Sequence, residues 1–238
     1  KKIFVIEVNP RATRTIPFIS KSIGISVAKI AVKCMLGISI KKQKLPRKIK
    51  HKFYFVKEVV FPFLKFPGVD PILGPEMKST GEVMGIGKNF GEAFAKSQIS
   101  TNVVIPENGT AFISVKNEDK KYIIDVAKKL LKFNFSLVAT HGTQEFLIKN
   151  NIECKRVNKV REGRTHIVDM IKNNEIDLIV NTTQTKQAIK DAYLIRREAL
   201  QYKVCYTTTI AGANALVGAV SYSKNLDVYK LQDIFKLA

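Results

Sequence analysis

Short apolar runs alternate with amphipathic patterns over the second half of the chain. Five runs have the character of strands, at residues 111–115 (AFISV), 135–139 (FSLVA), 153–157 (ECKRV), 176–180 (IDLIV) and 203–207 (KVCYT). Each run is followed by a segment with helical spacing, at residues 117–132, 143–150, 166–173, 185–201 and 210–220. Strands that alternate with helices form a mostly parallel sheet covered on both faces. We therefore predict a doubly wound α/β domain over residues 103–238.

The first hundred residues follow a different pattern. Residues 3–8 (IFVIEV) and 53–61 (FYFVKEVVF) predict strands, and residues 22–37 predict one helix that ends at Gly37. Residues 65–87 are rich in proline and glycine without periodicity, which predicts a long loop that is functional or packed on another domain. We place a domain boundary between residues 102 and 103.

Composition narrows the class of protein. The chain has 238 residues, 45% hydrophobic and 25% charged, as expected for one large or two ordinary globular domains. It shows neither an apolar run of about 18 residues nor a secretory leader, so we expect a cytoplasmic protein without a membrane partner. The three cysteines lack C-x-x-C spacing, which predicts reduced, mostly buried thiols. Because the chain starts with Lys1 and residues 3–8 resemble the middle of a domain, we expect a fragment.

The net charge of +20 raises the question of nucleic acid. The densest basic stretch is 41–52 (KKQKLPRKIKHK), which has no interleaved aromatic residues and no zinc-finger or RNA-binding signature. We therefore favour a solvated basic connector. A nucleic-acid-binding or scaffolding protein is kept as an alternative.

Small polar residues follow two of the predicted strands, at 139–143 (ATHGT) and 181–185 (NTTQT). Ligands of doubly wound sheets bind at the carboxyl ends of the strands, where hydroxyls and the N–H groups of helix N-termini attract anions. Lys120 and Lys159 could supply cations, so these residues together predict a phosphate pocket. Each residue alone also has a structural explanation, as a helix cap or a solvated lysine. His141 has two explanations, a base or a structural histidine.

The start of the chain carries its own chemistry. On a strand, Glu7, Asn9 and Arg11 lie on one face. Carboxylate and amide oxygens suit Mg²⁺, whereas Arg11 and Arg14 suit phosphate or carboxylate oxygens. This combination predicts nucleotide phosphoryl transfer, and a surface strand with a salt bridge is the alternative.

Several segments resemble the carboxyl-terminal part of the large subunit of carbamoyl phosphate synthetase, and the resemblance covers nearly the whole chain. These segments are VIEVNPRATRTIPFISKSIG, VKEVVFPFLKFPGVDPILGPEMKSTGEVMGIG, ATHGT, VNKVREGRTHI, NTTQ and RREALQYKVCYTTT. The second segment is the most specific because it is long and has no simple repeat.

The resemblance implies that residues 1–102 are the carboxyl-terminal part of the second ATP-grasp unit, which phosphorylates carbamate with ATP and Mg²⁺ or Mn²⁺ for pyrimidine and arginine synthesis. Glu7 and Asn9 match its metal ligands, and Arg11 and Arg14 match the arginines that hold the phosphoryl acceptor. A glutaminase subunit or domain would bind through an upstream region, and a homo-oligomer is compatible with the resemblance. We expect no turnover by this chain alone, because the glycine-rich loop and adenine pocket lie outside it.

Residues 103–238 resemble the methylglyoxal-synthase-like allosteric domain, which binds nucleoside monophosphates such as UMP or IMP. Its phosphate-binding positions match Lys120, Thr140, Thr143 and Lys159. Its ribose or base contacts match the run Asn181, Thr182 and Thr183. The resemblance therefore implies an effector site in the same place as the phosphate pocket.

Two further interpretations come from the same family. Glu58, Tyr206 and Thr208 match an ornithine site of related enzymes, although Thr207 and Phe61 depart from the enteric-type pattern and weigh against an ornithine response. The fold also supports stand-alone methylglyoxal synthase, a lyase that acts on dihydroxyacetone phosphate. That enzyme requires a carboxylate base and a P-H-D type motif, and the sequence NTTQTKQ after the fourth strand offers neither.

Overall fold

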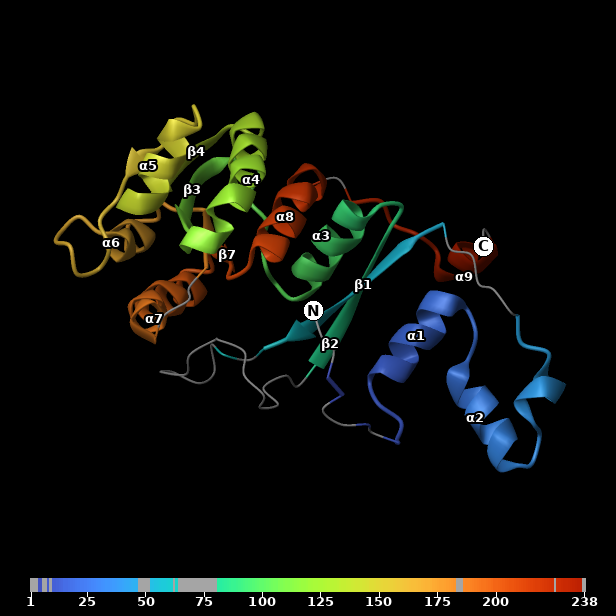
Figure 1. Ribbon diagram of the computed structural model, residues 1–238. Helices are drawn as coiled ribbons and strands as arrows, with labels where there is room; N and C mark the ends of the chain where they lie inside the picture. Colours follow the sequence, from blue (N-terminus) through green and yellow to red (C-terminus); the bar gives the residue numbers. More distant parts are fainter. Residues whose placement is uncertain are drawn as a thin grey trace. The chain divides into compact units, whose positions relative to one another are not determined.

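The computed structural model describes residues 4–5, 8, 10–46, 52–61, 63, 81–182, 186–224 and 226–236 (Figure 1). The chain divides into two compact units. The smaller unit comprises Lys1–Phe53 with Val228–Ala238, and the larger comprises Tyr54–Asp227. The predicted boundary between residues 102 and 103 falls inside the larger unit and stays a prediction.

The smaller unit is helical where it is described. Its elements are α1 (Thr15–Ile23), α2 (Val27–Met35), the 3₁₀ helix η1 (Ile40–Gln43) and α9 (Leu231–Lys236). The prediction of one helix over residues 22–37 was wrong, because Gly24 ends α1 in the left-handed conformation (φ 71°) that glycine tolerates best. Ser26 then caps α2 by accepting a hydrogen bond from the N–H of Lys29. The end of the predicted helix near Gly37 (φ 82°) is confirmed.

The predicted strand at residues 3–8 is absent at the residues that the structure describes. Phe4, Val5 and Val8 lie outside any strand, and about four fifths of each side chain is exposed. An apolar run forms a strand only where a neighbour pairs with its backbone groups, and the sequence pattern does not contain that information. Glu7 and Asn9 lie outside the described residues.

No single helix in the described ranges is long and apolar enough to cross a membrane. Helices α1 and α2 meet the length and composition criteria only as a pair, and they are bent by 109° at the break between them.

The larger unit begins with two antiparallel strands, β1 (Tyr54–Val60) and β2 (Gly81–Gly87), against which helix α3 (Phe90–Ser100) packs. The strand predicted at residues 53–61 is confirmed. The prediction of a loop over residues 65–87 is wrong for residues 81–87, which form β2. Residues 64–80 lie outside the described residues. Glycine weakens a strand by propensity, but Gly85 and Gly87 of β2 admit the backbone of α3 at close range.

The rest of the larger unit is a five-stranded sheet with the order β5-β4-β3-β6-β7, in which every pair is parallel. Its strands are β3 (Gly109–Ser114), β4 (Phe135–Ala139), β5 (Lys155–Arg156), β6 (Leu178–Asn181) and β7 (Cys205–Thr207). Its helices are η3 (Asn117–Asp119), α4 (Lys120–Lys132), α5 (His141–Lys149), α6 (Ile167–Lys172), α7 (Lys186–Gln201), α8 (Ile210–Ala219) and η4 (Val220–Tyr222). The prediction of a doubly wound α/β domain is confirmed.

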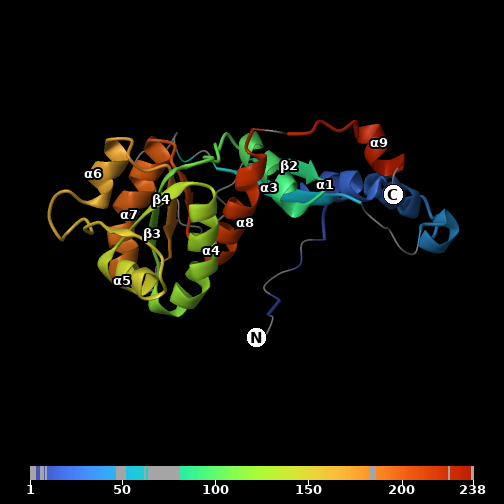
Figure 2. The same ribbon diagram turned by 90° about the horizontal axis from the view of Figure 1, so that it is seen from above.

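Both faces of this sheet are buried. Along β3, Ala111 and Ile113 face a core cluster that includes residues of α4 and α8, whereas Phe112 faces a second cluster with residues of α6 and α7. Figure 2 shows α6 and α7 on one side of β3 and β4, with α4 and α8 on the other. This arrangement explains the nearly continuous apolar character of the central strands.

The three thiols differ in exposure, so we expect them to differ in reactivity. Cys34 is exposed, while burial raises the pKa of Cys154 and of Cys205 from 9.0 to about 12. At pH 8 the thiol reagent DTNB should therefore label one thiol in the folded chain and three after denaturation. Rapid labelling of Cys154 in the folded chain would contradict this expectation.

The two buried thiols also make the free energy of unfolding depend on pH. Because their pKa values are higher in the folded chain than in the unfolded chain, their contribution to the free energy of unfolding is complete below pH 9.0 and is lost as the pH rises to about 12.

Candidate functional site

Hydroxyl groups gather at the carboxyl edge of the five-stranded sheet. Ser114 ends β3, and its Oγ lies 3.1 Å from Oγ1 of Thr140, the residue after β4. The hydroxyl of Thr143 accepts a hydrogen bond from the N–H of Val115 (3.2 Å). The hydroxyl of Thr182, after β6, accepts one from the N–H of Lys116 (3.1 Å). These contacts connect the ends of three neighbouring strands. We call the four side chains Ser114, Thr140, Thr143 and Thr182 the hydroxyl cluster.

The accepted hydrogen bonds leave donor capacity in this cluster. A hydroxyl carries one donor and two acceptor positions, so Thr143 and Thr182 each retain a proton after accepting a backbone N–H. Both side chains are buried, with Thr143 only 2% exposed. Because a buried O–H group gains from a partner, these protons suit the oxygens of an anion.

Helix α5 begins beside the hydroxyl cluster and presents its N-terminus there. Thr140 precedes the helix in an extended conformation, and its carbonyl oxygen accepts hydrogen bonds from the N–H groups of Thr143 and Gln144 (both 2.9 Å). His141 and Gly142 form the first turn, where a helix leaves its own N–H groups without partners inside it. The partial positive charge of this end favours an anion.

Lys120 brings its charge to the same place. It is the first residue of α4, and its Nζ would lie 3.6 Å from a Cβ built on Gly142. The ammonium group therefore lies next to the first turn of α5. A lysine charge, a helix N-terminus and two donor hydroxyls in one place form an arrangement that can bind a phosphate group.

Asn181 adds an unsatisfied donor at this edge. It ends β6, pairs in register with Ser114, and is 5% exposed. Its Nδ2 has no hydrogen-bond partner among the described residues, although buried amide groups are nearly always paired. A ligand that offers an oxygen would satisfy this group. Thr183, the next predicted contact after Thr182, lies outside the described residues.

Lys159 lies on the loop after β5 and is exposed. Its backbone N–H donates to Oε2 of Glu162 (3.0 Å), which shapes the start of this loop. The loop ends at a capping box in which His166 and Asp169 exchange hydrogen bonds at the start of α6. Because β5 is parallel to β4, Lys159 leaves the sheet at the same edge as Thr140. The structure gives no contact between the Lys159 side chain and the hydroxyl cluster, so its role stays a prediction.

His141 lies on the first turn of α5 with about half of its side chain exposed. Its Nε2 is 3.5 Å from Oε1 of Glu145, one turn further along the helix. This pairing on the helix surface favours the structural interpretation over a catalytic base.

Sequence reasoning missed Ser114. The sequence did contain a signal, because a polar residue ends the apolar strand AFIS and thus stands at the carboxyl edge. Its contact with Thr140 depends on the pairing of β3 with β4, which only the folded structure reveals.

The residues predicted for phosphoryl transfer are not assembled within the described part of the chain. Arg11 and Arg14 are exposed near the start of α1, and their proposed partners Glu7 and Asn9 lie outside the description. The roles of all four residues remain predictions.

The predicted ornithine positions lie on separate elements of the larger unit. Glu58 of β1 accepts a hydrogen bond from Nε2 of Gln98 on α3 (3.0 Å). Tyr206 of β7 packs against the core cluster on the α6 and α7 side, while Thr208 is exposed. The Glu58 carboxylate therefore has a partner on α3, and its remaining acceptor positions leave the role in an amino-acid site a prediction.

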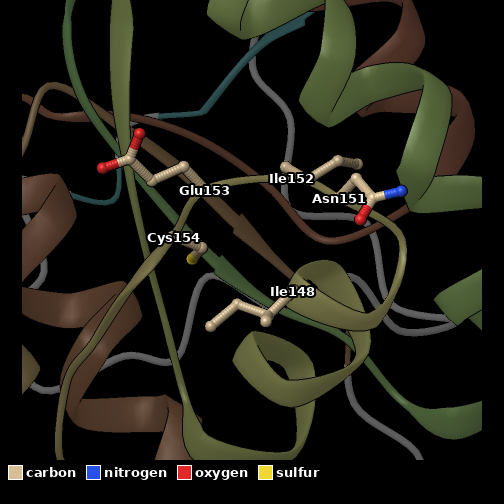
Figure 3. A pocket seen from close by; sticks show the side chains of 5 residues that line it. All are labelled: Ile148, Asn151, Ile152, Glu153 and Cys154. Carbon is tan, nitrogen blue, oxygen red and sulfur yellow. The ribbon is translucent and has the colours of Figure 1, made fainter.

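A pocket of about 310 Å³ lies elsewhere, between the end of α5 and β5 (Figure 3). It is lined by Ile148, Asn151, Ile152, Glu153 and Cys154. This segment precedes β5, so the pocket lies at the amino edge of the sheet, opposite the hydroxyl cluster. None of the predicted site residues that the structure describes lines it, and burial raises the pKa of the Cys154 thiol to about 12.

The comparison with protein families matches residues 122–208 to the MGS-like domain. Apart from Lys120, the predicted nucleotide-site residues lie within this match. Among solved structures, the chain is similar to methylglyoxal synthase from Elizabethkingia anophelis NUHP1, with a TM-score of 0.38 and 20% identity. That similarity covers 48% of this chain and 80% of the other.

Curated relatives match almost the whole chain. It is 55% identical over 232 residues to the carbamoyl phosphate synthase large chain of Pseudomonas syringae pv. tomato, and 53% identical over 232 residues to that of Pseudomonas aeruginosa. Each match covers 98% of this chain and 22% of the relative's length. The predicted resemblance is confirmed: over 98% of its length the chain is similar to the carboxyl-terminal region of carbamoyl phosphate synthase large chains, and it contains an MGS-like domain.

Proposed function

We propose that this chain binds the phosphate of a nucleoside monophosphate at the carboxyl edge of its five-stranded sheet, and so carries the effector site of a carbamoyl phosphate synthase. The observation that carries the proposal is the arrangement at this edge, where Lys120 and the start of α5 lie beside the hydroxyls of Thr143 and Thr182. The unpaired Nδ2 of Asn181 supplies a donor for the ribose or base. UMP and IMP are the effectors to test first.

The activity of the whole protein is also a proposal, because the chain spans only 22% of the length of its relatives. The names of those relatives support synthesis of carbamoyl phosphate by a protein in which this sequence is part of a large chain. Dependence on ATP, Mg²⁺ or Mn²⁺ and a glutaminase partner is what the family resemblance implies. Residues 1–102 would then supply Arg11 and Arg14 for the phosphoryl acceptor, and Glu7 and Asn9 for the metal. The chain by itself would regulate this reaction without performing it.

The two alternative functions receive no comparable support. A lyase needs a carboxylate base at the end of β6, where this chain has Asn181 and Thr182, an amide and a hydroxyl. For nucleic acid, the relatives give no support, since their names describe a biosynthetic enzyme.

A calorimetric titration of UMP, then IMP, into the chain tests the proposed effector site. We expect saturable binding that weakens about 10- to 100-fold in Lys120→Ala, because a hydrogen bond to a charged group contributes about 1.5–3 kcal/mol. Lys159→Ala should also weaken the binding of the nucleotide. Lys128→Ala is the matched control, since it removes an exposed lysine from the same helix, and it should bind like the original chain.

Two results would contradict the proposal. If neither nucleotide binds the unmodified chain, the effector function is wrong. If both bind but Lys120→Ala has unchanged affinity, the nucleotide binds elsewhere and the assignment of the carboxyl edge is wrong.

A further inference from the structure

Helix α8 begins at the carboxyl edge of the sheet. Thr209 caps it by accepting the N–H of Gly212 at Oγ1 (3.0 Å). Gly212 also packs so tightly on the side chain of Thr207 that a Cβ would overlap the Thr207 hydroxyl. The first turn of α8 is therefore fixed to the last residue of β7, at the edge that carries the hydroxyl cluster.

The other end of α8 touches α3 through backbone atoms. A Cβ on Gly91 of α3 would overlap the carbonyl oxygen of Gly218 in α8. A Cβ on Gly218 would meet none of the described residues within 4 Å. The close approach of the two helices thus depends on glycine at position 91 and not on glycine at position 218.

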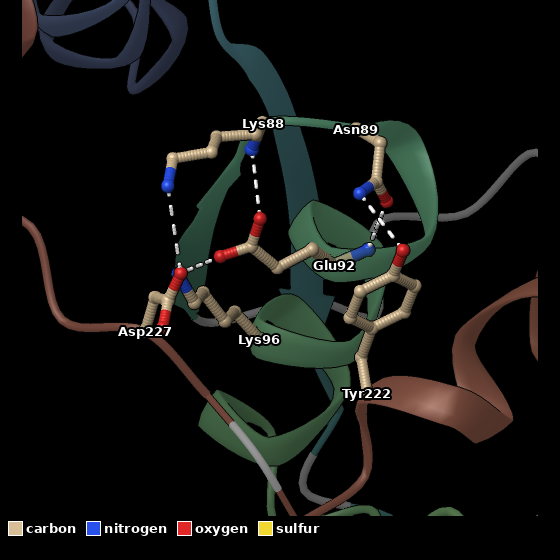
Figure 4. Close-up of polar contacts among 6 residues, drawn as sticks. All are labelled: Lys88, Asn89, Glu92, Lys96, Tyr222 and Asp227. Carbon is tan, nitrogen blue, oxygen red and sulfur yellow. Dashed lines mark hydrogen bonds and ion pairs between the residues drawn. The ribbon is translucent and has the colours of Figure 1, made fainter.

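The chain after α8 is also bound to the start of α3 (Figure 4). Tyr222, in η4, accepts a hydrogen bond at its hydroxyl from Nδ2 of Asn89 (2.9 Å). The Oδ1 of the same Asn89 caps α3 by accepting the N–H of Glu92 (3.0 Å). One amide side chain therefore connects both helical segments.

Charged groups order the start of α3 next to this junction. Glu92 is 4% exposed, and its carboxylate accepts the N–H of Lys88 (2.8 Å) and pairs with Nζ of Lys96 (2.7 Å). The Nζ of Lys88 lies 3.6 Å from Oδ2 of Asp227, beyond η4. The two partners of Glu92 lie in α3 and just before it, so they order the first turn of this helix, while the exposed Lys88–Asp227 pair is the charged contact with the segment after η4.

Helix α3 is packed equally tightly on β2. A Cβ on Gly85 would overlap the carbonyl oxygen of Ala93 and crowd the N–H of Ser97. Strand β2 pairs with β1, which carries Glu58 opposite Val83. A continuous series of close contacts therefore runs from the end of β7 through α8 and α3 to β1 and β2.

We propose that α8 and α3 form a rigid connection that transmits ligand binding at the carboxyl edge to β1 and β2, with Gly91 as the contact that it requires. The identity of the ligand rests on the proposed function, whereas the connection itself does not. Tightly packed interfaces move as units, so a change at the first turn of α8 shifts α3 when the Gly91 contact is intact. The ligand acts through its different affinity for the two positions of this unit.

Amide hydrogen exchange on the 238-residue chain tests the connection. Saturating UMP should slow exchange in α3 and β2 by at least about fivefold, the lower end of typical coupling between sites. Gly91→Ala should bind UMP with similar affinity but lose this slowing in α3 and β2. Gly218→Ala should retain it. If Gly91→Ala retains the slowing, the proposed connection is wrong.

A second arm needs no ligand, so it separates the connection from the effector function. Thr209→Ala removes the cap of α8 and should speed exchange in α8, α3 and β2, whereas Thr209→Ser keeps the hydroxyl and should not. In the Gly91→Ala background, the effect of Thr209→Ala should stop at α8. If Thr209→Ala alone, with Gly91 intact, speeds exchange in α8 but not in α3 and β2, the proposed connection is wrong, even if UMP binds. If UMP does not bind but this arm behaves as expected, the connection stands and the effector function fails.

Discussion

Thr143→Val is expected to weaken both the fold and the binding of nucleotide. Valine keeps the shape of threonine but removes the oxygen that accepts the N–H of Val115, in a position that is 2% exposed. A buried N–H left without a partner costs about 1–3 kcal/mol of the free energy of unfolding. The same change removes a hydroxyl donor from the phosphate site, so UMP affinity should fall at least about tenfold.

Urea unfolding and calorimetry measure the two effects of Thr143→Val separately. Thr143→Ser is the matched control, because it keeps the hydroxyl and loses only a methyl group. We expect the serine chain to bind UMP nearly as well as the original. A valine chain with unchanged stability and affinity would show that the hydroxyl of Thr143 neither supports Val115 nor faces the ligand.

Gly85→Ala is expected to have the largest effect on stability. Its Cβ would overlap backbone atoms of Ala93 and Ser97, which cannot rotate away as a side chain can. Helix α3 must therefore shift from β2, at a cost of about 3 kcal/mol or more, the upper part of the range for overpacking. Urea unfolding gives the loss, and exchange in α3 should rise because its packing is disturbed.

Gly81→Ala is the control for Gly85→Ala, on the same strand and four residues earlier. Within the described part of the chain, a Cβ at Gly81 meets side-chain atoms of Val60, at 3.5 and 3.7 Å, which is ordinary contact. Its free energy of unfolding should be unchanged or higher by about 0.5 kcal/mol, since alanine restricts the unfolded chain. Equal stability of the two variants would mean that β2 and α3 are not packed as tightly as described.

The sequence predicted some of the site directly and some only by family likeness. Thr140 and Thr143 are predicted directly, because a parallel sheet brings the ends of its strands to one edge. Lys120 is predicted as the cation for an anion bound at that edge. Ser114 was missed, although it is the hydroxyl that contacts Thr140. The orientation of Asn181, with an unpaired amide, could not be foreseen, because it depends on which groups of neighbouring strands approach it.

The amino-acid sequence was sufficient to predict the class and order of the α/β domain, because burial on both faces leaves apolar runs such as 111–115 that can be recognised locally. It also identified the family through long specific segments. Tertiary structure decided the strand β2 and the contact of Gly91 with Gly218. Helix α3 was not predicted, although the sequence contains a local signal for it, the cap formed by Asn89 and Glu92.

The contact of Gly91 could not be predicted from any local pattern. A glycine has no side chain from which a pattern can be recognised, and its role depends on which distant backbone approaches it once the chain has folded.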